Sequence, residues 1–252
     1  MPAPTTLLRR RIDALARTAL VVAALGLGAT ACAGERPSLG AATVGTSSSS
    51  TSSTSTTTSS SVPVGDRVLG VDDLLGYIAT PDGTPTVRTE PAEGAKAVDI
   101  GPTTEAGAPT TFAVVGDPTT PAAEARGWYE VLLPTRPNGT TGWVPASSVK
   151  ISKTPFRVFV DLTGRSLRVE DGAKTVMDAP IAIGTTANPP PTGATYVTEL
   201  FRNTQPGGAY GPYAYGLALH SNTLTEFGGG DGQVGIHGTN APSKIGQAVA
   251  HG

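Results

Sequence analysis

Residues 235–252 read GIHGTNAPSKIGQAVAHG and contain two of the three histidines of the chain, His237 and His251. His237 ends an apolar, strand-like run, VGI, and the loop that follows carries His251 back toward it. A glycine follows each histidine, and glycine lets the backbone approach a ligand closely. Two imidazoles can serve a thiol or hydroxyl nucleophile, one as its base and one as a positioning or stabilising group. The stretch therefore predicts a site for covalent chemistry.

The residues before this stretch predict a β-rich unit over 154–252. Apolar and polar residues alternate over 156–162, the chain turns near Gly164, and a second strand is expected over 166–169. Turn signals and further strand-like runs follow in order: DG at 171–172, a long strand over 176–184, PTGATYV at 191–197, a Gly/Tyr-rich segment at 207–220 and FGGGDG at 227–232. This order predicts an antiparallel meander that leads into the His237 strand.

These motifs, in this order, resemble the L,D-transpeptidases, the YkuD-type cell-wall enzymes. Residues 236–240 match the family's I-H-G-T segment, and His251 and Gly252 match its S/T-H-G-C segment, which contains the nucleophilic cysteine. Ala250 departs from the family's Ser or Thr, and the given sequence stops at Gly252. The resemblance implies a β-rich catalytic domain that is C-terminally incomplete, cut just before the cysteine.

The resemblance also implies roles for individual residues. His237 matches the base that makes the thiolate, whereas His251 and Gly252 match the segment that positions the nucleophile and stabilises the tetrahedral oxyanion. Four residues are expected to contact substrate: Tyr213, Tyr215, His220 and Gly238. A structural, hydrogen-bonded role is the alternative for His220, and Asp231 is expected to be a turn former. The resemblance implies no metal and no organic cofactor.

The implied reaction is acyl transfer on peptidoglycan stem peptides, in which a thioester is resolved by an amine of a second stem to form a cross-link. The first alternative is an L,D-carboxypeptidase, in which water resolves the same thioester. The second is a non-enzymatic, wall-binding lipoprotein. The given chain is expected to be inactive, because its single cysteine, Cys32, is far from His237 in the sequence.

Residues 1–32 predict an export signal. Three arginines at 9–11 precede the apolar run ALVVAALGLG at 19–28, which is too short to span a bilayer as a mature helix. Small residues lead to Cys32 in a pattern that resembles a bacterial lipobox, although A-x-A cleavage after Ala31 is the alternative. We therefore expect an exported protein at the outer face of the cytoplasmic membrane or in the wall, held by a lipid on Cys32. Residues 33–66, with an unbroken Ser/Thr run at 46–61, predict a disordered linker.

Residues 67–150 predict a first folded unit. Its clearest signal is a hairpin, WYEVL at 128–132 and TGWV at 141–144, with an Asn138-Gly139 turn between them. Shorter strands are expected near 77–80 and 86–88. The hairpin, with both tryptophans, resembles bacterial Src-homology-3-like domains. Binding of wall peptide or glycan and a plain spacer role are both open for this unit, and the spacer is favoured.

Composition narrows the class of protein further. Thirty-two glycines, 22 prolines and few aromatic residues favour a mainly β fold. A net charge of −2 gives no indication of nucleic-acid binding, and one cysteine excludes an intrachain disulfide or a cysteine-based metal site. The chain has no H-E-x-x-H, G-x-S-x-G or P-loop motif. Nothing in the sequence indicates an oligomeric state.

Overall fold

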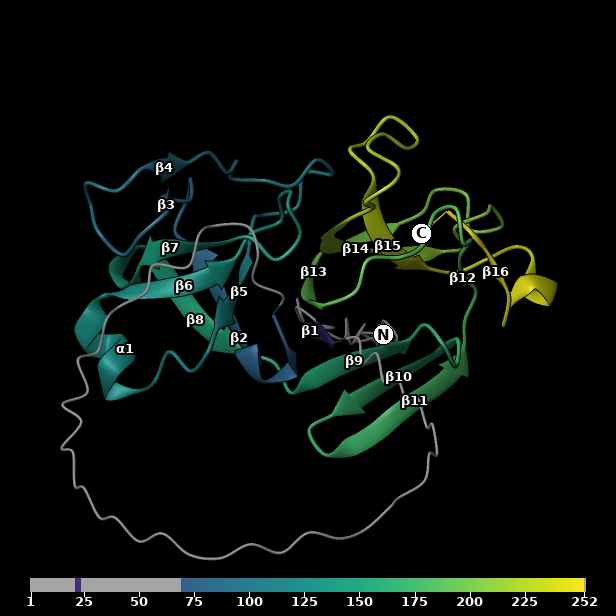
Figure 1. Ribbon diagram of the computed structural model, residues 1–252, viewed down its shortest axis with the longest axis horizontal. Helices are drawn as coiled ribbons and strands as arrows, with labels where there is room; N and C mark the ends of the chain where they lie inside the picture. Colours follow the sequence, from purple (N-terminus) through teal and green to yellow (C-terminus); the bar gives the residue numbers. More distant parts are fainter. Residues whose placement is uncertain (1–20, 24–68, 252) are drawn as a thin grey trace, which may run out of the picture.

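The computed structural model describes residues 21–23 and 69–251. Strands dominate these residues, so the prediction of a mainly β fold is confirmed. Two seven-stranded sheets contain most of the strands among the described residues, and the chain passes from the first to the second after Lys153 (Figure 1). Within the described part, no helix is long and apolar enough to cross a membrane.

The first unit is built on a sheet with the strand order β4-β3-β7-β6-β5-β2-β8. Its strands are β2 (Leu74–Pro81), β3 (Val87–Arg88), β4 (Ala97–Val98), β5 (Phe112–Val115), β6 (Trp128–Leu132), β7 (Thr141–Pro145) and β8 (Val149–Lys153). The three-residue 3₁₀ helices η1 (Val71–Asp73) and η2 (Ala146–Ser148) lie at strand ends. The resemblance to a Src-homology-3-like barrel stays a prediction.

One short helix, α1 (Pro121–Arg126), was not expected from the sequence. The Thr120 hydroxyl accepts a hydrogen bond from the Ala123 amide, Pro121 occupies the first turn, and Gly127 ends the helix in the left-handed conformation. These caps allow a helix of only six residues, too short to show a periodic apolar pattern.

The predicted hairpin is confirmed, and its Asn-Gly turn is one part of a longer connection between the two strands. Strands β6 and β7 pair from Trp128 with Pro145 to Leu132 with Thr141. Eight residues, 133–140, connect them, and the Leu133 amide donates to the Thr140 carbonyl at 2.9 Å. The Thr140 amide donates to the Pro137 carbonyl at 3.2 Å, which closes a turn with Asn138 and Gly139 at its centre, as predicted. The Asn138 side chain points to the second unit.

The second unit is built on a sheet with the order β11-β10-β9-β1-β13-β14-β15. Its strands are β1 (Val21–Ala23), β9 (Phe156–Asp161), β10 (Ser166–Asp171), β11 (Lys174–Pro180), β13 (Ala194–Arg202), β14 (Tyr213–His220) and β15 (Gln233–His237). A separate parallel pair joins β12 (Ile183–Gly184) to β16 (Ala248–Ala250), and η3 (Pro242–Lys244) precedes β16. The predicted meander, β9 to β11, is confirmed.

The prediction of a single long strand over 176–184 is wrong. Strand β11 pairs with β10 and ends at Pro180, after which the Ile181 amide donates to the Arg165 carbonyl. The chain then changes partner, and β12 pairs with β16. Pro180 itself interrupts no bond to β10, because the Ile181 amide beyond it still donates to Arg165. The strand divides because residues 183–184 pair with β16 instead.

Strand β1 comes from the apolar run of the predicted export signal. It lies between β9, to which it is parallel, and β13, to which it is antiparallel. Cleavage before or at Cys32 would remove it, so β1 and a cleaved signal are incompatible in one mature chain. The lipobox at Cys32 and the linker over 33–66 lie outside the described residues.

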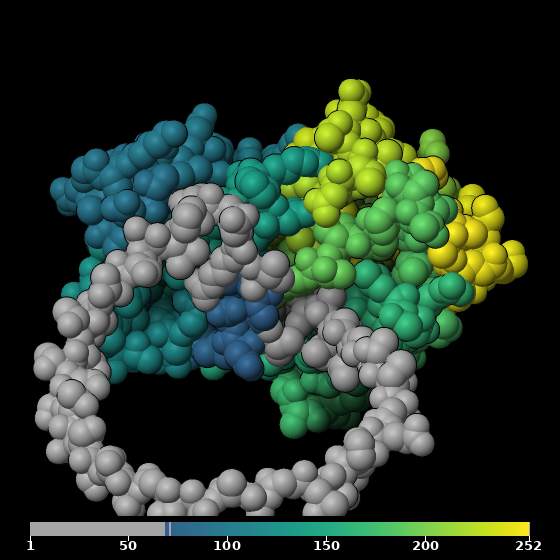
Figure 2. Space-filling view, viewed as in Figure 1, coloured from purple at the N-terminus to yellow at the C-terminus, as the bar shows by residue number. Residues whose placement is uncertain are grey.

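Three apolar clusters form the core. One lies within the first unit (Ala79, Val87, Phe112, Val114, Val131, Leu133, Val144) and one within the second (Val158, Leu167, Val197, Leu217, Leu219, Val234). The third joins the two units, with Leu69, Leu74, Ala113 and Leu132 packed against Ala194, Tyr196 and Ala218. In the space-filling view, the surface of the first unit abuts that of the second (Figure 2). The two units therefore share part of their core.

Candidate active site

His237 is the last residue of β15, and its ring is exposed. Its Nδ1 lies 2.6 Å from the Gly238 carbonyl oxygen. A carbonyl oxygen can only accept, so Nδ1 carries the hydrogen and Nε2 carries the lone pair when the ring is neutral. The Tyr210 ring packs edge-on against the imidazole, with the ring centroids 4.8 Å apart. This arrangement fixes the orientation of a histidine whose Nε2 can accept a proton.

Backbone approaches backbone closely beside His237. A Cβ added at Gly211, whose φ is +63°, would lie 2.9 Å from the Gly238 Cα, and a Cβ added at Gly238 would lie 3.2 Å from the Gly211 Cα. The Gly238 amide donates to the Tyr213 carbonyl at 3.4 Å. Gly238 thus lies against Gly211 beside His237, and a side chain at either glycine would push the two segments apart. Contact of Gly238 with substrate stays a prediction.

The structure does not bring the rings of Tyr213 and Tyr215 to the same face as His237. In the β14–β15 ladder, His237 lies opposite Ala214, and residues directly opposite share a face. Tyr213 and Tyr215 flank Ala214, so their side chains project from the other face, where they are 48% and 38% exposed. Their contact with substrate stays a prediction that this geometry does not support.

His251 follows β16 and is held through the parallel pairing of β12 with β16. The Thr185 amide donates to the Ala250 carbonyl at 3.1 Å, immediately before His251. The exposed His251 ring lies against Phe227, with centroids 5.1 Å apart and planes tilted by 34°. No hydrogen bond joins the two imidazoles in the part of the chain that the structure describes, and Gly252 lies outside it.

His220 is at the far end of β14 from His237. The register pairs His220 with Gln233 and Ala214 with His237, which separates the two histidines by roughly 13–20 Å along the strands. The His220 residue is only 4% exposed, and its Nε2 lies 2.8 Å from Asp231 Oδ2. The expectation that Asp231 is only a turn former is therefore wrong. This burial fits the structural role that the sequence left open for His220.

Burial lowers the pKa of His220 below its ordinary value of 6.5, the Arg136 guanidinium acts in the same direction, and the Asp231 carboxylate opposes both. The lowered pKa and the close carboxylate are reconciled if a neutral imidazole donates Nε2–H to Asp231. Nδ1 then holds only a lone pair, and among the described residues no donor faces it. An unpaired acceptor is less costly to bury than an unpaired charge.

This environment predicts a loss of stability in acid. Below pH 6.5 the unfolded chain protonates His220, whereas the folded ring resists protonation. The unfolded state then binds more protons, so the free energy of unfolding falls as the pH drops from 6.5 through the folded-state pKa. Urea unfolding at about pH 7.5 and about pH 5.5, compared with the variant His220→Asn, measures this. If the free energy of unfolding falls equally in the unsubstituted chain and in His220→Asn, the prediction is contradicted.

Comparison with known proteins identifies the family. A family model described as the L,D-transpeptidase catalytic domain, YkuD, matches residues 155–252. The chain is 34% identical over 138 residues to a protein of Bacillus licheniformis that carries the name L,D-transpeptidase YkuD. It is 31% identical over 137 residues to the protein of the same name in Bacillus subtilis. Each match covers 52% of this chain and 75% of the relative. The chain therefore belongs to the YkuD family of L,D-transpeptidases.

Sequence reasoning missed two residues that contact the candidate site: Tyr210, which packs against His237, and Phe227, which packs against His251. Tyr210 and Phe227 were seen only as parts of glycine-rich segments, where an aromatic ring has no periodicity to indicate its direction. Their aromatic character in otherwise polar loops was the one available signal. Within residues 69–251, no group of three His, Cys, Asp or Glu side chains is arranged to hold a metal ion.

Proposed function

We propose that this chain carries the catalytic domain of a peptidoglycan L,D-transpeptidase that cross-links stem peptides through a cysteine thioester. The nucleophile is a cysteine directly after Gly252, where the family's H-G-C segment has it. His237 takes the thiol proton, and the thiolate attacks the stem-peptide carbonyl. The His251–Gly252 segment positions the thiolate and stabilises the oxyanion. The terminal D-alanine leaves as its amine takes up a proton, and an amine of a second stem displaces the thiolate to form the cross-link.

The observation that carries this proposal is the geometry of His237. The bond from Nδ1–H to the Gly238 carbonyl leaves Nε2 as a proton acceptor, and the ring is exposed at a strand end where a substrate can reach it. The edge-on Tyr210 ring restricts rotation of the imidazole. A base held in one tautomer and one orientation suits removal of a thiol proton.

Product analysis tests the proposal and separates it from its first alternative. A chain that extends through the natural sequence after Gly252 is incubated with a labelled tetrapeptide stem and an amine-bearing acceptor stem. Cross-linked product is expected. Labelled tripeptide without any cross-link would instead indicate an L,D-carboxypeptidase. Absence of both products from a folded chain would favour a wall-binding protein without catalysis.

The site of action is proposed to be outside the cytoplasmic membrane, with the chain anchored through a lipid on Cys32. The charged, apolar and small-residue segments of residues 1–32 support this proposal. The intact mass of the mature protein tests it, because an acylated N-terminus at Cys32, an unmodified N-terminus at Cys32 and a retained residue 1 differ in mass. Retention of residues 21–23 would contradict export by cleavage and would preserve strand β1.

A further inference from the structure

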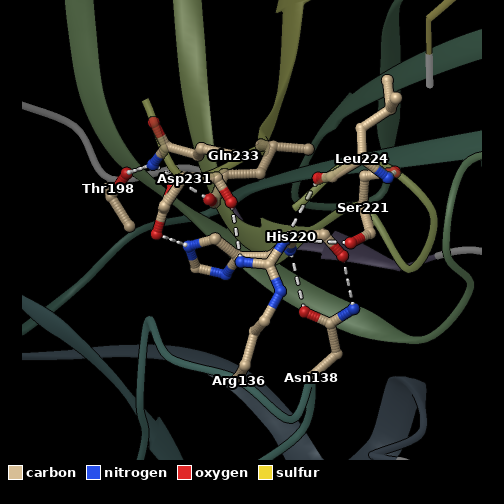
Figure 3. Close-up of polar contacts among 9 residues, drawn as sticks. Arg136, Asn138, Thr198, His220, Ser221, Leu224, Asp231 and Gln233 are labelled. Atoms are coloured by element: carbon tan, nitrogen blue, oxygen red, sulfur yellow. Dashed lines mark hydrogen bonds and ion pairs between the residues drawn. The ribbon is translucent and has the colours of Figure 1, made fainter. Parts of the chain in front are cut away.

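One arginine of the first unit holds both ends of the loop that joins β14 to β15. This loop spans residues 221–232. Arg136 Nη2 donates to the carbonyl oxygens of Ser221 at 2.9 Å and Leu224 at 3.3 Å, and Nη1 donates to that of Asp231 at 2.7 Å (Figure 3). A guanidinium presents its donors in a rigid fork, so a single side chain fixes the distance between the start and the end of the loop.

Asn138 fixes the residue from which the 221–232 loop leaves the sheet. Its Oδ1 accepts from the His220 amide at 2.8 Å, and its Nδ2 donates to the His220 carbonyl at 2.7 Å (Figure 3). The side-chain amide thus pairs with a backbone as a neighbouring strand would. Nδ2 also lies 3.4 Å from Asn222 Oδ1. Arg136 and Asn138 both belong to the connection between β6 and β7.

Bonds within the loop close its base. The Ser221 amide donates to the Gly232 carbonyl at 2.8 Å, and the Ser221 hydroxyl accepts from the Leu224 amide at 3.1 Å. Gly232 has a φ of +78°, and a Cβ there would overlap with the Leu224 carbonyl oxygen. These contacts fix the base of the loop, from which its tip extends.

The tip of the same loop carries Phe227, whose ring lies 5.1 Å from the His251 ring. Phe227 is 41% exposed, so burial of apolar surface is a weak restraint on its position. Its backbone is turned by reciprocal bonds with Gly230, in which each amide donates to the other's carbonyl at 2.9 and 3.0 Å. The position of the ring beside His251 thus depends on how the loop is anchored. Arg136 and Asn138 anchor it to the first unit. The Thr223 hydroxyl also ties the loop to the second unit, since it donates to Asn188 Oδ1 at 3.1 Å.

The two units are also joined by contacts other than these anchors. The shared apolar cluster already joins them through Leu74 and Leu132 on one side and Tyr196 on the other. Thr104 of the first unit also donates to the buried Glu199 of the second. Arg136 and Asn138 act instead on a loop that reaches the candidate site.

We infer that the connection between β6 and β7 is a positioning element of the catalytic site. By holding the 221–232 loop, Arg136 and Asn138 set Phe227 against His251 and so restrict the His251 ring. This inference rests on the proposed role of His251. The contacts that carry it, from Arg136 and Asn138 to Phe227 and His251, all lie among the residues that the structure describes. The first unit is then part of the catalytic apparatus and not only a spacer.

Nuclear magnetic resonance of the histidine rings in the full chain tests the inference, since three histidines give three assignable sets of ring signals. In the variant Phe227→Leu, the His251 ring signals are expected to shift because the aromatic neighbour is gone. Arg136→Ala is expected to shift the His251 signals toward those of Phe227→Leu and to leave the His237 signals unchanged. Arg136→Lys is expected to shift them only in part, because an ammonium cannot span three carbonyls.

Arg126→Ala is the matched control. It removes the same charge from the first unit, where Arg126 stacks 5.2 Å from the centre of the Trp143 ring, and it does not contact the loop. If Arg136→Ala shifts His251 no more than Arg126→Ala does, the inference is wrong, and Arg136 only helps to join the units. If Arg136→Ala does not fold, Asn138→Ala gives the same comparison. The readout needs no turnover, so an inactive enzyme would contradict the proposed function and leave this inference intact.

Discussion

A chain that ends at Gly252 is expected to form no covalent adduct with a carbapenem, a β-lactam that acylates the cysteine of this family. A chain extended through the cysteine proposed to follow Gly252 is expected to gain the mass of one carbapenem. The reason is chemical: a histidine base without a thiol has nothing to activate, and neither Ala250 nor Gly252 offers a nucleophile. Intact mass spectrometry measures both outcomes.

His237→Gln in the extended chain is the matched variant for this experiment. Loss of a general base is expected to slow adduct formation by roughly 10²- to 10⁴-fold, while the thiol itself is kept. Lys150→Ala is the control, because Lys150 is an exposed residue of the first unit that pairs with Asp82 and should leave the rate nearly unchanged. An adduct on the chain that ends at Gly252 would overturn the assignment of the nucleophile.

Shortening a side chain in the apolar cluster that joins the two units is expected to have the largest effect on the free energy of unfolding. Leu132 is 1% exposed and packs in the cluster that joins the two units. Leu132→Ala removes a buried isobutyl group and is expected to lower the free energy of unfolding by about 2–5 kcal/mol. Because Tyr196 and Ala218 lie in the same cluster, the loss is expected to reach β13 and β14 as well.

The adjacent residue provides the control. Leu133 is 0% exposed, but it packs in the cluster that lies wholly within the first unit. Leu133→Ala is expected to cost a similar amount, with the loss confined to the first unit. Amide hydrogen exchange in β13 and β14 distinguishes the two variants. Equal exchange in both would mean that the units unfold independently and that the shared cluster contributes little.

The same cluster bears on whether the first unit can fold without the second. Its hairpin and both tryptophans lie within residues 67–150, which suggests a core that needs nothing from the rest of the chain. In the structure, Leu69, Leu74 and Leu132 are buried against the second unit. Separated from it, the first unit would expose this apolar face, and a lower stability is expected for the isolated segment.

The sequence by itself determined the elements whose signals are local. Alternating apolar residues predicted β9 and β10, turn residues predicted the ends of the meander, and the I-H-G-T segment located His237 at the end of a strand. Each of these depends on residues within a few positions of one another. The family followed from the same local motifs, and the comparisons with relatives confirmed it.

Only the tertiary structure decided which distant residues meet. The division of the 176–184 strand depends on β16, some 65 residues further along the chain. Asn138 carries a local turn signal, yet its amide pairs with the His220 backbone, 82 positions away. Asp231 was expected only to form a turn, and it binds a buried imidazole. Such contacts are set by how sheets pack and which faces they bury, and no local pattern of residue types encodes that.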